Sequence, residues 1–213
     1  MLNGLAPEQK RGVLATARRR KFARGEVVFH EGDPGNTIHL IERGHVAVRV
    51  TSPLGDAATL RVLGPGEYFG ELALISPAPR NATIVTLENV ETLALHTNEL
   101  QRLRREYPDV DRVLLEAVVQ EVRRLSSALL DAMYVPARVR LARQLVDLAR
   151  RFPADAGGRV VIPLTQDDLA GLCGTTRPTV NQLLGKLNEK HLVELARGRI
   201  VVVDLGGLTR LAR

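Results

Sequence analysis

The sequence predicts an α+β protein of several domains: an N-terminal domain of β-strands, a long central helix, and a C-terminal domain of helices and strands. Three observations predict it. Short β-type runs fill the first half of the chain, a heptad-like apolar repeat follows them, and two amphipathic segments joined by a glycine lie near the end. The 213 residues suffice for one large domain or two small ones. With 45% apolar and 25% charged residues, the composition excludes a disordered or fibrous chain.

Several other protein classes are excluded by what the chain lacks. No run approaches the roughly 18 consecutive apolar residues of a membrane span, and residues 1–21 contain no apolar core of a secretory signal. The single cysteine, Cys173, excludes an internal disulfide, a four-thiolate zinc site and an all-cysteine iron–sulfur cluster. We therefore expect a cytoplasmic protein with no membrane partner, in which Cys173 is a small core residue and not a redox thiol.

The N-terminal domain is predicted from short apolar runs separated by turn residues. Turn residues stand at 32–35, 43–44 and 64–66. The runs lie at 27–29, 38–41, 46–50, 59–63, 82–86 and 91–95. Many short strands at this spacing favour a sandwich, a barrel or a jelly roll. We expect one helix before them, at 7–17, and another after them, which Thr97 caps.

The central segment, residues 108–133, reads as one long helix. Its apolar residues recur at alternating steps of three and four: Leu115, Val118, Val122, Leu125, Leu129 and Ala132. This 3.5-residue period is typical of a coiled-coil seam. A helix of about 25 residues is nearly 38 Å long, which favours a dimer interface over a helix lying along its own domain. We divide the chain into residues 1–107, a dimerisation helix and hinge at 108–135, and residues 136–213.

The C-terminal segment begins at Pro136, which breaks the long helix. Thr165 and Asp168 have the spacing of a capping box, and Gly174 ends the helix that they open. Thr176 is placed to cap the next helix, and Pro178 falls in its first turn. Two helices of about 8 and 13 residues around a glycine turn form a helix-turn-helix. A hairpin at 194–203, turning at 197–198, would be its wing.

The second helix of this pair has an apolar and a polar face. Val180, Leu183, Leu184 and Leu187 form the apolar stripe. The opposite face carries Arg177, Thr179, Asn181 and Gln182. Arginine suits the acceptors of guanine, whereas asparagine and glutamine suit adenine. Phosphate contacts are expected from Thr165, Thr176, Thr179, Lys186 and Arg199.

Charge is concentrated in the same part of the chain. Residues 136–213 contain 13 basic and 7 acidic side chains, an excess that equals the +6 of the whole protein. A small basic domain of this kind is typical of nucleic-acid binding. The alternative is a helical hairpin used only for packing, with a solvated basic surface. Together with the polar helix face, the charge favours DNA.

A candidate anion site lies between residues 69 and 83. Gly70 permits close approach of the backbone, and residues 71–74 begin a short helix whose free N–H groups suit a phosphate. Arg80 can neutralise that phosphate, and Glu71 can accept a bond from a sugar hydroxyl. These groups predict a ribose-phosphate clamp. A Glu71–Arg80 salt bridge that only closes the loop is the alternative.

Three stretches resemble a known family. Phe69-Gly-Glu-Leu-Ala-Leu with Pro79-Arg-Asn-Ala-Thr resembles the phosphate-binding cassette of cyclic-nucleotide-binding domains, and residues 24–35 resemble their opening strands. Leu164-Thr-Gln-Asp-Asp-Leu-Ala and Gly174-Thr-Thr-Arg-Pro-Thr-Val-Asn resemble the helix-turn-helix of the CRP/FNR transcription regulators. The family includes CAP, a familiar example of helix-turn-helix docking. The resemblance implies an N-terminal jelly roll, a central dimer helix and a C-terminal winged helix.

The resemblance also implies roles for single residues. Glu71 would hold the ribose 2′-OH and Arg80 the cyclic phosphate, with backbone contacts from Gly70, Leu72 and Ala73. Asn81 stands where the family often has Ser or Thr, which departs from the cAMP pattern. On the long helix, Ser126 and Ser127 stand near the positions where cAMP-responsive members have a Thr-Ser pair, and Arg123 is a candidate partner for Glu71 or the phosphate.

The expected effector is therefore cAMP or another cyclic nucleotide. The expected partners are a two-fold symmetric DNA operator, a second copy of the chain and RNA polymerase. A regulator that needs no ligand, or binds a different one, is the alternative within the family.

Enzymes and metal sensors fit the sequence less well. An iron–sulfur sensor needs several cysteines, and no haem ligand set matches His30, His39, His45, His96 and His191. A cupin-type metal enzyme needs clustered histidines, but the sequence has no His-x-His pair. We therefore expect a protein that is not an enzyme and that binds no metal, haem or iron–sulfur cluster.

Overall fold

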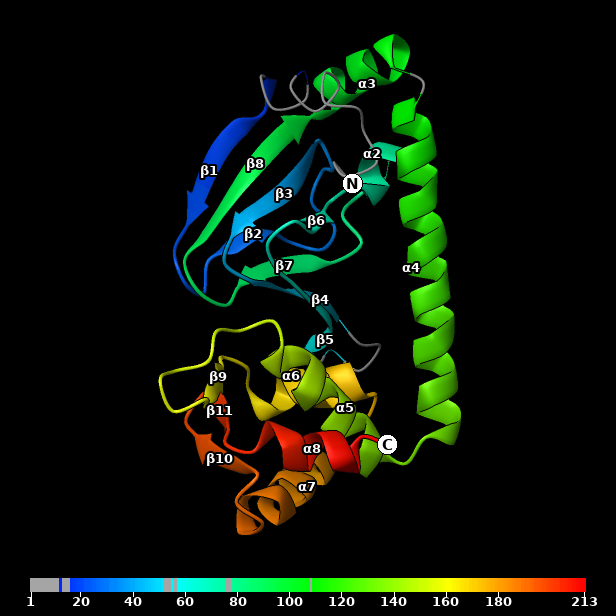
Figure 1. Ribbon diagram of the computed structural model, residues 1–213. Helices are drawn as coiled ribbons and strands as arrows, with labels where there is room; N and C mark the ends of the chain where they lie inside the picture. The colour runs from blue at the N-terminus through cyan, green and yellow to red at the C-terminus, as the bar shows by residue number, and fades with distance from the viewer. Residues whose placement is uncertain (1–11, 13–15, 52–54, 56, 76–77, 108) are drawn as a thin grey trace. The chain divides into compact units, whose positions relative to one another are not determined.

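The computed structural model describes residues 12, 16–51, 55, 57–75, 78–107 and 109–213 (Figure 1). Most of the helix predicted at 7–17 lies outside these residues. Contacts divide the chain into two compact units. The first comprises Met1–Val50 and Leu63–Ser126, and the second comprises Thr51–Val62 and Ser127–Arg213.

Eight strands form two sheets in the N-terminal half: β1 (Arg18–Phe22), β2 (Val27–Phe29), β3 (Thr37–Arg43), β4 (Val46–Thr51), β5 (Ala57–Leu63), β6 (Tyr68–Phe69), β7 (Thr83–Thr86) and β8 (Val90–His96). The sheet orders are β1-β8-β3-β6 and β2-β7-β4-β5. The pairs β1–β8, β3–β8, β3–β6, β2–β7 and β4–β7 are antiparallel. Two four-stranded antiparallel sheets are the arrangement of a jelly roll.

Both sheets contribute to one apolar core. Phe22, Ile41, Phe69 and Val90 come from the first sheet, and Val46, Leu63 and Ile84 come from the second. All seven side chains are buried. Because side chains alternate along a strand, every second residue of β3 faces this core. That alternation also positions polar residues of β3 beside the ligand loop described below.

Two strands, β1 and β6, lack the alternating apolar residues by which the other strands are predicted. β1 has the sequence RRRKF, and only Phe22 of its five residues is buried. It is an edge strand paired with β8, and its basic side chains form ion pairs, Arg19 with Glu42 and Lys21 with Glu91. Charged side chains are common on edge strands because they discourage pairing with other chains. β6 has only two residues, too few for any alternation.

The first unit contains α2 (Leu72–Ile75), α3 (Thr97–Glu106) and most of α4 (Asp109–Tyr134). The prediction that Thr97 caps α3 is wrong. His96 occupies the N-cap, and the Thr97 hydroxyl, inside the first turn, is buried without a hydrogen-bond partner among the described residues. The strand β8 continues to His96, so the helix begins directly where the strand ends.

The long helix α4 changes character along its length. Val110, Val113 and Leu114 are buried against Leu100 and Leu103 of α3. Beyond them, large apolar side chains are exposed: Leu115, Val119, Val122, Leu125, Leu129, Leu130, Met133 and Tyr134. Eight of the 14 exposed large apolar side chains of the described residues therefore lie on this one helix. The helix stops at Tyr134, just before Pro136, as predicted, and Pro136 is the N-cap of the next helix.

The second unit contains α5 (Ala137–Ala149), β9 (Val160–Ile162), α6 (Gln166–Cys173), α7 (Arg177–Glu189), β10 (Val193–Ala196), β11 (Arg199–Val202) and α8 (Leu205–Leu211). Its sheet has the order β10-β11-β9. The core includes Leu145, Ile162, Leu169, Leu184 and Ile200. The predicted helix pair and hairpin are confirmed, but Leu183 is only half-buried. No helix in the described part of the chain has the length and apolarity of a membrane span.

Candidate functional site

Arg80 lies between α2 and β7, and its guanidinium is held by hydrogen bonds to other parts of the first unit. The residue is only 4% exposed. Its Nη1 donates to the Gly70 carbonyl at 3.0 Å. Its Nη2 donates to the Thr37 carbonyl at 2.8 Å and to the Thr37 hydroxyl at 2.9 Å. Its Cζ lies 4.0 Å from the centroid of the Phe29 ring, a cation–π contact. Several separate segments therefore fix one cation.

Gly70 is required by this arrangement. Its φ of +87° lies in the left-handed region. A Cβ at this position would lie 2.6 Å from Arg80 Nη1 and 2.8 Å from the Thr37 carbonyl oxygen. Both contacts are too short for a real side chain. Gly70 therefore permits close approach, as predicted, and the groups that approach its backbone are Arg80 and Thr37 of the protein itself.

Burial and two carboxylates act on the charge of Arg80 in opposite directions. Burial lowers the pKa of Arg80, whereas the carboxylates of Asp33 and Glu71 raise it. The buried Nε–H has no hydrogen-bond partner among the described residues. Unpaired buried donors are uncommon in folded proteins. A guanidinium with such a donor can pair with an anion that reaches it.

The other predicted ligand residues fall into two groups. Gly70, Glu71, Leu72, Ala73, Arg80 and Asn81 share one loop around α2, where Glu71 is half-buried and Leu72 and Asn81 are exposed. Arg123, Ser126 and Ser127 are exposed on α4. The Ser126 hydroxyl donates to the Val122 carbonyl of its own helix at 2.9 Å. The structure thus gathers the cassette residues, and the roles of the α4 residues stay predictions.

Sequence reasoning missed three contributors to the Arg80 site: Phe29, Thr37 and His39. His39 is buried, and its ring lies parallel to Phe69 with centroids 5.0 Å apart. Burial, and then Arg80, lower the pKa of His39 from 6.5 to about 4. The alternation of β3 puts residues 37, 39 and 41 on one face, which is the sequence signal for Thr37 and His39.

The helix-turn-helix is built from local signals. The Thr165 hydroxyl accepts from the Asp168 N–H, and the Asp168 carboxylate accepts from the Thr165 N–H, which completes the predicted capping box. Gly174 ends α6 with a φ of +57°. Thr176 is the N-cap of α7 as predicted, but its hydroxyl bonds the Thr179 hydroxyl at 2.9 Å and no backbone N–H. The predicted side-chain cap at Thr176 is therefore wrong.

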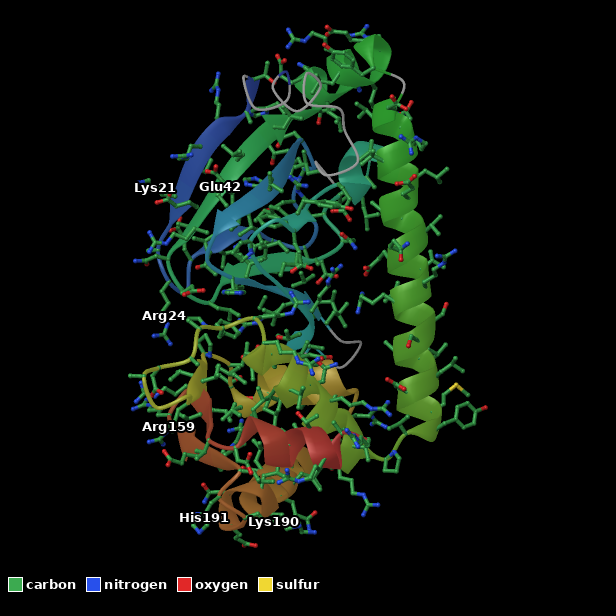
Figure 2. The ribbon with its side chains drawn as sticks, viewed as in Figure 1. Lys21, Arg24, Glu42, Arg159, Lys190 and His191 are labelled. Carbon is green, nitrogen blue, oxygen red and sulfur yellow. The ribbon has the colours of Figure 1, made fainter. Side chains whose placement is uncertain are left out.

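The polar face of α7 is open to solvent. Except for the half-buried Thr179, the predicted DNA-contacting residues are exposed: Thr165, Thr176, Arg177, Asn181, Gln182, Lys186 and Arg199. Arg177 forms an ion pair with Asp167 of α6 at 3.2 Å. A pocket between the starts of these helices and the β10–β11 turn is lined by Asp167, Arg177, Arg197 and Arg199 among others. Figure 2 shows further basic groups of this unit, Arg159, Lys190 and His191.

One arginine joins the end of α4 to the helix-turn-helix. Arg140 Nη1 donates to the carbonyls of Asp131, Ala132 and Val135. Its Nε and Nη2 donate to the carbonyls of Cys173 and Gly174 at 2.7 and 3.1 Å. The Cys173 side chain is buried, and burial raises the pKa of its thiol to about 12. The guanidinium of Arg140 thus bonds both the end of α4 and the α6–α7 turn. Cys173 is a core residue, as predicted.

Comparison with known proteins gives matches in both units. Residues 19–107 match the family model of the cyclic nucleotide-binding domain. Residues 139–211 match that of the Crp-like helix-turn-helix domain. The two matches contain the Arg80 loop and the exposed face of α7, respectively.

Relatives match the chain along its whole length. A CRP-like cAMP-activated global transcriptional regulator from Mycobacterium tuberculosis is 30% identical over 215 residues, covering 100% of this chain and 96% of the relative. The cyclic AMP receptor protein of Thermus thermophilus is 32% identical over 212 residues, with the same coverage. The fold is also that of the global regulator CLP from Xanthomonas campestris, with a TM-score of 0.76 and 23% identity over 93% of this chain and 100% of that chain.

The two domain matches occur in the order expected for one family, and the relatives are similar to this chain over its full length. The chain belongs to the CRP/FNR family of transcription regulators and carries a cyclic nucleotide-binding domain ahead of its DNA-binding helix-turn-helix.

Proposed function

We propose that the protein is a homodimeric regulator whose DNA binding is controlled by cAMP bound at the 70–81 loop. The single observation that carries the proposal is Arg80, a buried guanidinium that bonds the Gly70 carbonyl and whose Nε–H has no partner among the described residues. The cyclic phosphate would pair with Arg80, and the ribose 2′-OH with Glu71. Two full-length relatives are named for cAMP, which favours this nucleotide over other anions.

The proposed organisation follows the chain: a sensor at 1–107, a dimerisation helix and hinge at 108–135, and a DNA-binding domain at 136–213. The dimer would bury the exposed apolar side chains of α4 between Leu115 and Met133. Leaving so large an apolar stripe in water is costly, since its burial contributes about 25 cal/mol per Å². Leu125→Glu should convert a dimer into a monomer in sedimentation velocity, and an unchanged sedimentation coefficient would contradict the interface.

DNA would be read by the exposed face of α7. Arg177, Asn181 and Gln182 would contact base edges, and Thr165, Thr176, Thr179, Lys186 and Arg199 would contact phosphates. In a dimer, two such faces about 34 Å apart fit successive turns of a two-fold symmetric operator. By its resemblance to the family, the protein would bind DNA in the cytoplasm and would contact RNA polymerase.

The control would be a shift in population between two arrangements of the DNA-binding domains. A ligand moves such an equilibrium only by its differential affinity for the two states. The Arg140 contacts offer a route, because they tie the last carbonyls of α4 to the carbonyls of the α6–α7 turn. A shift of the end of α4 would therefore be passed to the DNA-reading helix.

A second candidate is a regulator that needs no cyclic nucleotide. Asn81 favours it, because this exposed amide replaces the hydroxyl that the family often has. The X. campestris protein with the same fold is described as responsive to c-di-GMP, so the fold alone does not fix the effector.

Calorimetric titration with cAMP, and with cGMP for comparison, tests the proposal. We expect micromolar or tighter cAMP binding that Arg80→Ala removes. Arg102→Ala, which changes an exposed arginine of α3, is the matched control and should bind as the unchanged protein does. Absence of binding by either nucleotide would refute cyclic-nucleotide control and favour the second candidate.

A further inference from the structure

Four polar side chains form a continuous chain of hydrogen bonds inside the first unit. It runs from Arg80 Nη2 to the Thr37 hydroxyl at 2.9 Å, and from that hydroxyl to His39 Nε2 at 3.2 Å. It ends at the Thr92 hydroxyl, 3.0 Å from His39 Nδ1. Arg80, His39 and Thr92 are only 4, 6 and 0% exposed. Thr37 is half-buried, so the chain runs from a half-buried hydroxyl at β3 into the core at His39 and Thr92.

The fold explains why these residues meet. Thr37 and His39 are two residues apart on β3, so their side chains lie on the same face. On β8, Ala94 pairs with His39 and Thr92 pairs with Ile41. Thr92 is thus the diagonal neighbour of His39, within reach of a long side chain. Three segments that are distant in sequence supply one chain.

A guanidinium can only donate, so the Thr37 hydroxyl accepts from Arg80, and its own O–H remains available to donate to His39 Nε2. In that arrangement His39 is the neutral tautomer with its proton on Nδ1, which donates to the Thr92 hydroxyl. The neutral ring suits its surroundings, since Phe69 stacks on it at 5.0 Å and the rings of Phe22 and Phe29 lie 6.1 and 6.4 Å away.

We propose that His39 is a positioning residue for Arg80 and acts through the Thr37 hydroxyl. By accepting a hydrogen bond from that hydroxyl, His39 keeps an oxygen lone pair directed at Arg80 Nη2. With Nη1 bonded to the Gly70 carbonyl and the guanidinium over the Phe29 ring, Arg80 is held in one orientation, and its buried Nε–H has no partner among the described residues. The inference rests on the proposed function of Arg80 as the phosphate ligand. A site held in place before binding loses less entropy when its ligand arrives.

The first test is calorimetric titration of the full-length protein with cAMP. His39→Phe keeps a ring against Phe69 but removes the acceptor, and Thr37→Val removes the hydroxyl. Each should weaken cAMP binding about tenfold, and the double variant should also lose only about tenfold, because both changes break the same link. Thr37→Ser keeps the hydroxyl and should stay within about twofold of the unchanged protein.

His45→Phe is the matched control for loss of a buried histidine. His45 is 6% exposed in the same unit and bonds Glu88 at 2.6 Å. Its cAMP affinity should not change. Unchanged affinity in His39→Phe, or losses that multiply in the double variant, would overturn the proposal. If His39→Phe does not fold, equal affinities of Thr37→Val and Thr37→Ser would overturn it.

The second test needs no ligand. In ¹⁵N NMR, His39 should be the Nδ1–H tautomer at pH 7, and the Arg80 guanidinium protons should exchange with water faster in His39→Phe than in the unchanged protein. If the unchanged protein binds neither nucleotide, the proposed function fails, and this measurement alone decides the positioning role. An Nε2–H tautomer, or equal Arg80 exchange in both proteins, would overturn it.

Discussion

The ligand loop and the DNA-reading helix hold their arginines in opposite ways. Arg80 is 4% exposed and bonds the Gly70 carbonyl, 10 residues away, and the carbonyl and hydroxyl of Thr37, 43 residues away. The side chain of Arg177 is 62% exposed, and its ion-pair partner is Asp167, at a side-chain exposure of 53%. One guanidinium is fixed by the core, whereas the other is free to adapt at the surface.

This difference in burial predicts how amino-acid substitutions should act at each site. Around Arg80 nearly every atom has a neighbour, so substitutions should act on folding and on ligand binding together. Around Arg177 the helix is already stabilised by Val180, Leu184 and Leu187 on its buried face. Substitutions on its exposed face should change DNA binding and leave folding alone, because exposed ion pairs contribute little to stability.

The largest expected effect is at Gly70. Gly70→Ala places a Cβ against Arg80 and Thr37 at a φ of +87°. Strain and overpacking together should lower the free energy of unfolding by about 4 kcal/mol. Gly66→Ala is the matched control, because Gly66 has a φ of +85° and open space around it, and it should cost only about 1 kcal/mol. Equal losses for the two variants in urea unfolding would contradict the close packing.

A pH dependence should follow from His39. Its pKa is lowered from 6.5 to about 4 in the folded protein, so between these values the unfolded chain binds more protons. The contribution of neutral His39 to the free energy of unfolding should therefore be fully present above pH 6.5. It should fall by about 3 kcal/mol as the pH drops to 4. Urea unfolding at both pH values measures it, and His39→Phe should remove this part of the slope. The same slope in His39→Phe and in the unchanged protein would contradict the assignment.

At the DNA-reading face the effect should be smaller and confined to binding. Arg177→Ala should weaken specific DNA binding by about 2 kcal/mol and relax the preference at one base pair. Its urea unfolding should not change. Arg210→Ala, an exposed arginine of α8 paired with Asp204, is the control for loss of one positive charge. If both variants weaken DNA binding equally at the same salt concentration, Arg177 contributes charge and no base recognition.

The smallest effect compares the two threonines that begin the helix pair. Thr165→Ala removes a hydroxyl that accepts from the Asp168 N–H, and should cost about 1 kcal/mol of stability. Thr176→Ala removes a hydroxyl that bonds only Thr179 among the described contacts, and should cost less than about 0.5 kcal/mol. Thermal unfolding of the two variants distinguishes them, and the reverse order would show that the cap geometry is wrong.

The same comparison explains what could be predicted from the sequence. The capping box, Gly174, Pro178 and the 197–198 turn are signals within a few residues, so the sequence alone predicts each of them. The strands with apolar alternation can be predicted for the same reason. By contrast, β1 is a strand because β8 is beside it, and its RRRKF sequence contains no such signal.

The neighbours of Arg80 could not be predicted for a related reason. Thr37, Phe29 and His39 reach Arg80 only through strand pairing between distant segments. The motif at 69–83 predicted which residues gather in the loop, but not that the arginine would already be bonded by the protein. Thr97 failed as a cap because β8 continues one residue further than its apolar pattern.

The most direct test of the account is DNA binding with and without cAMP. Fluorescence anisotropy would use a duplex enriched from a random pool by the protein in the presence of cAMP, at one fixed salt concentration. We predict that cAMP raises the affinity of the unchanged protein at least about tenfold, as a coupling of 1–3 kcal/mol allows. Arg80→Ala should bind with the same affinity whether or not cAMP is present. Equal affinity of the unchanged protein in both conditions would contradict cyclic-nucleotide control.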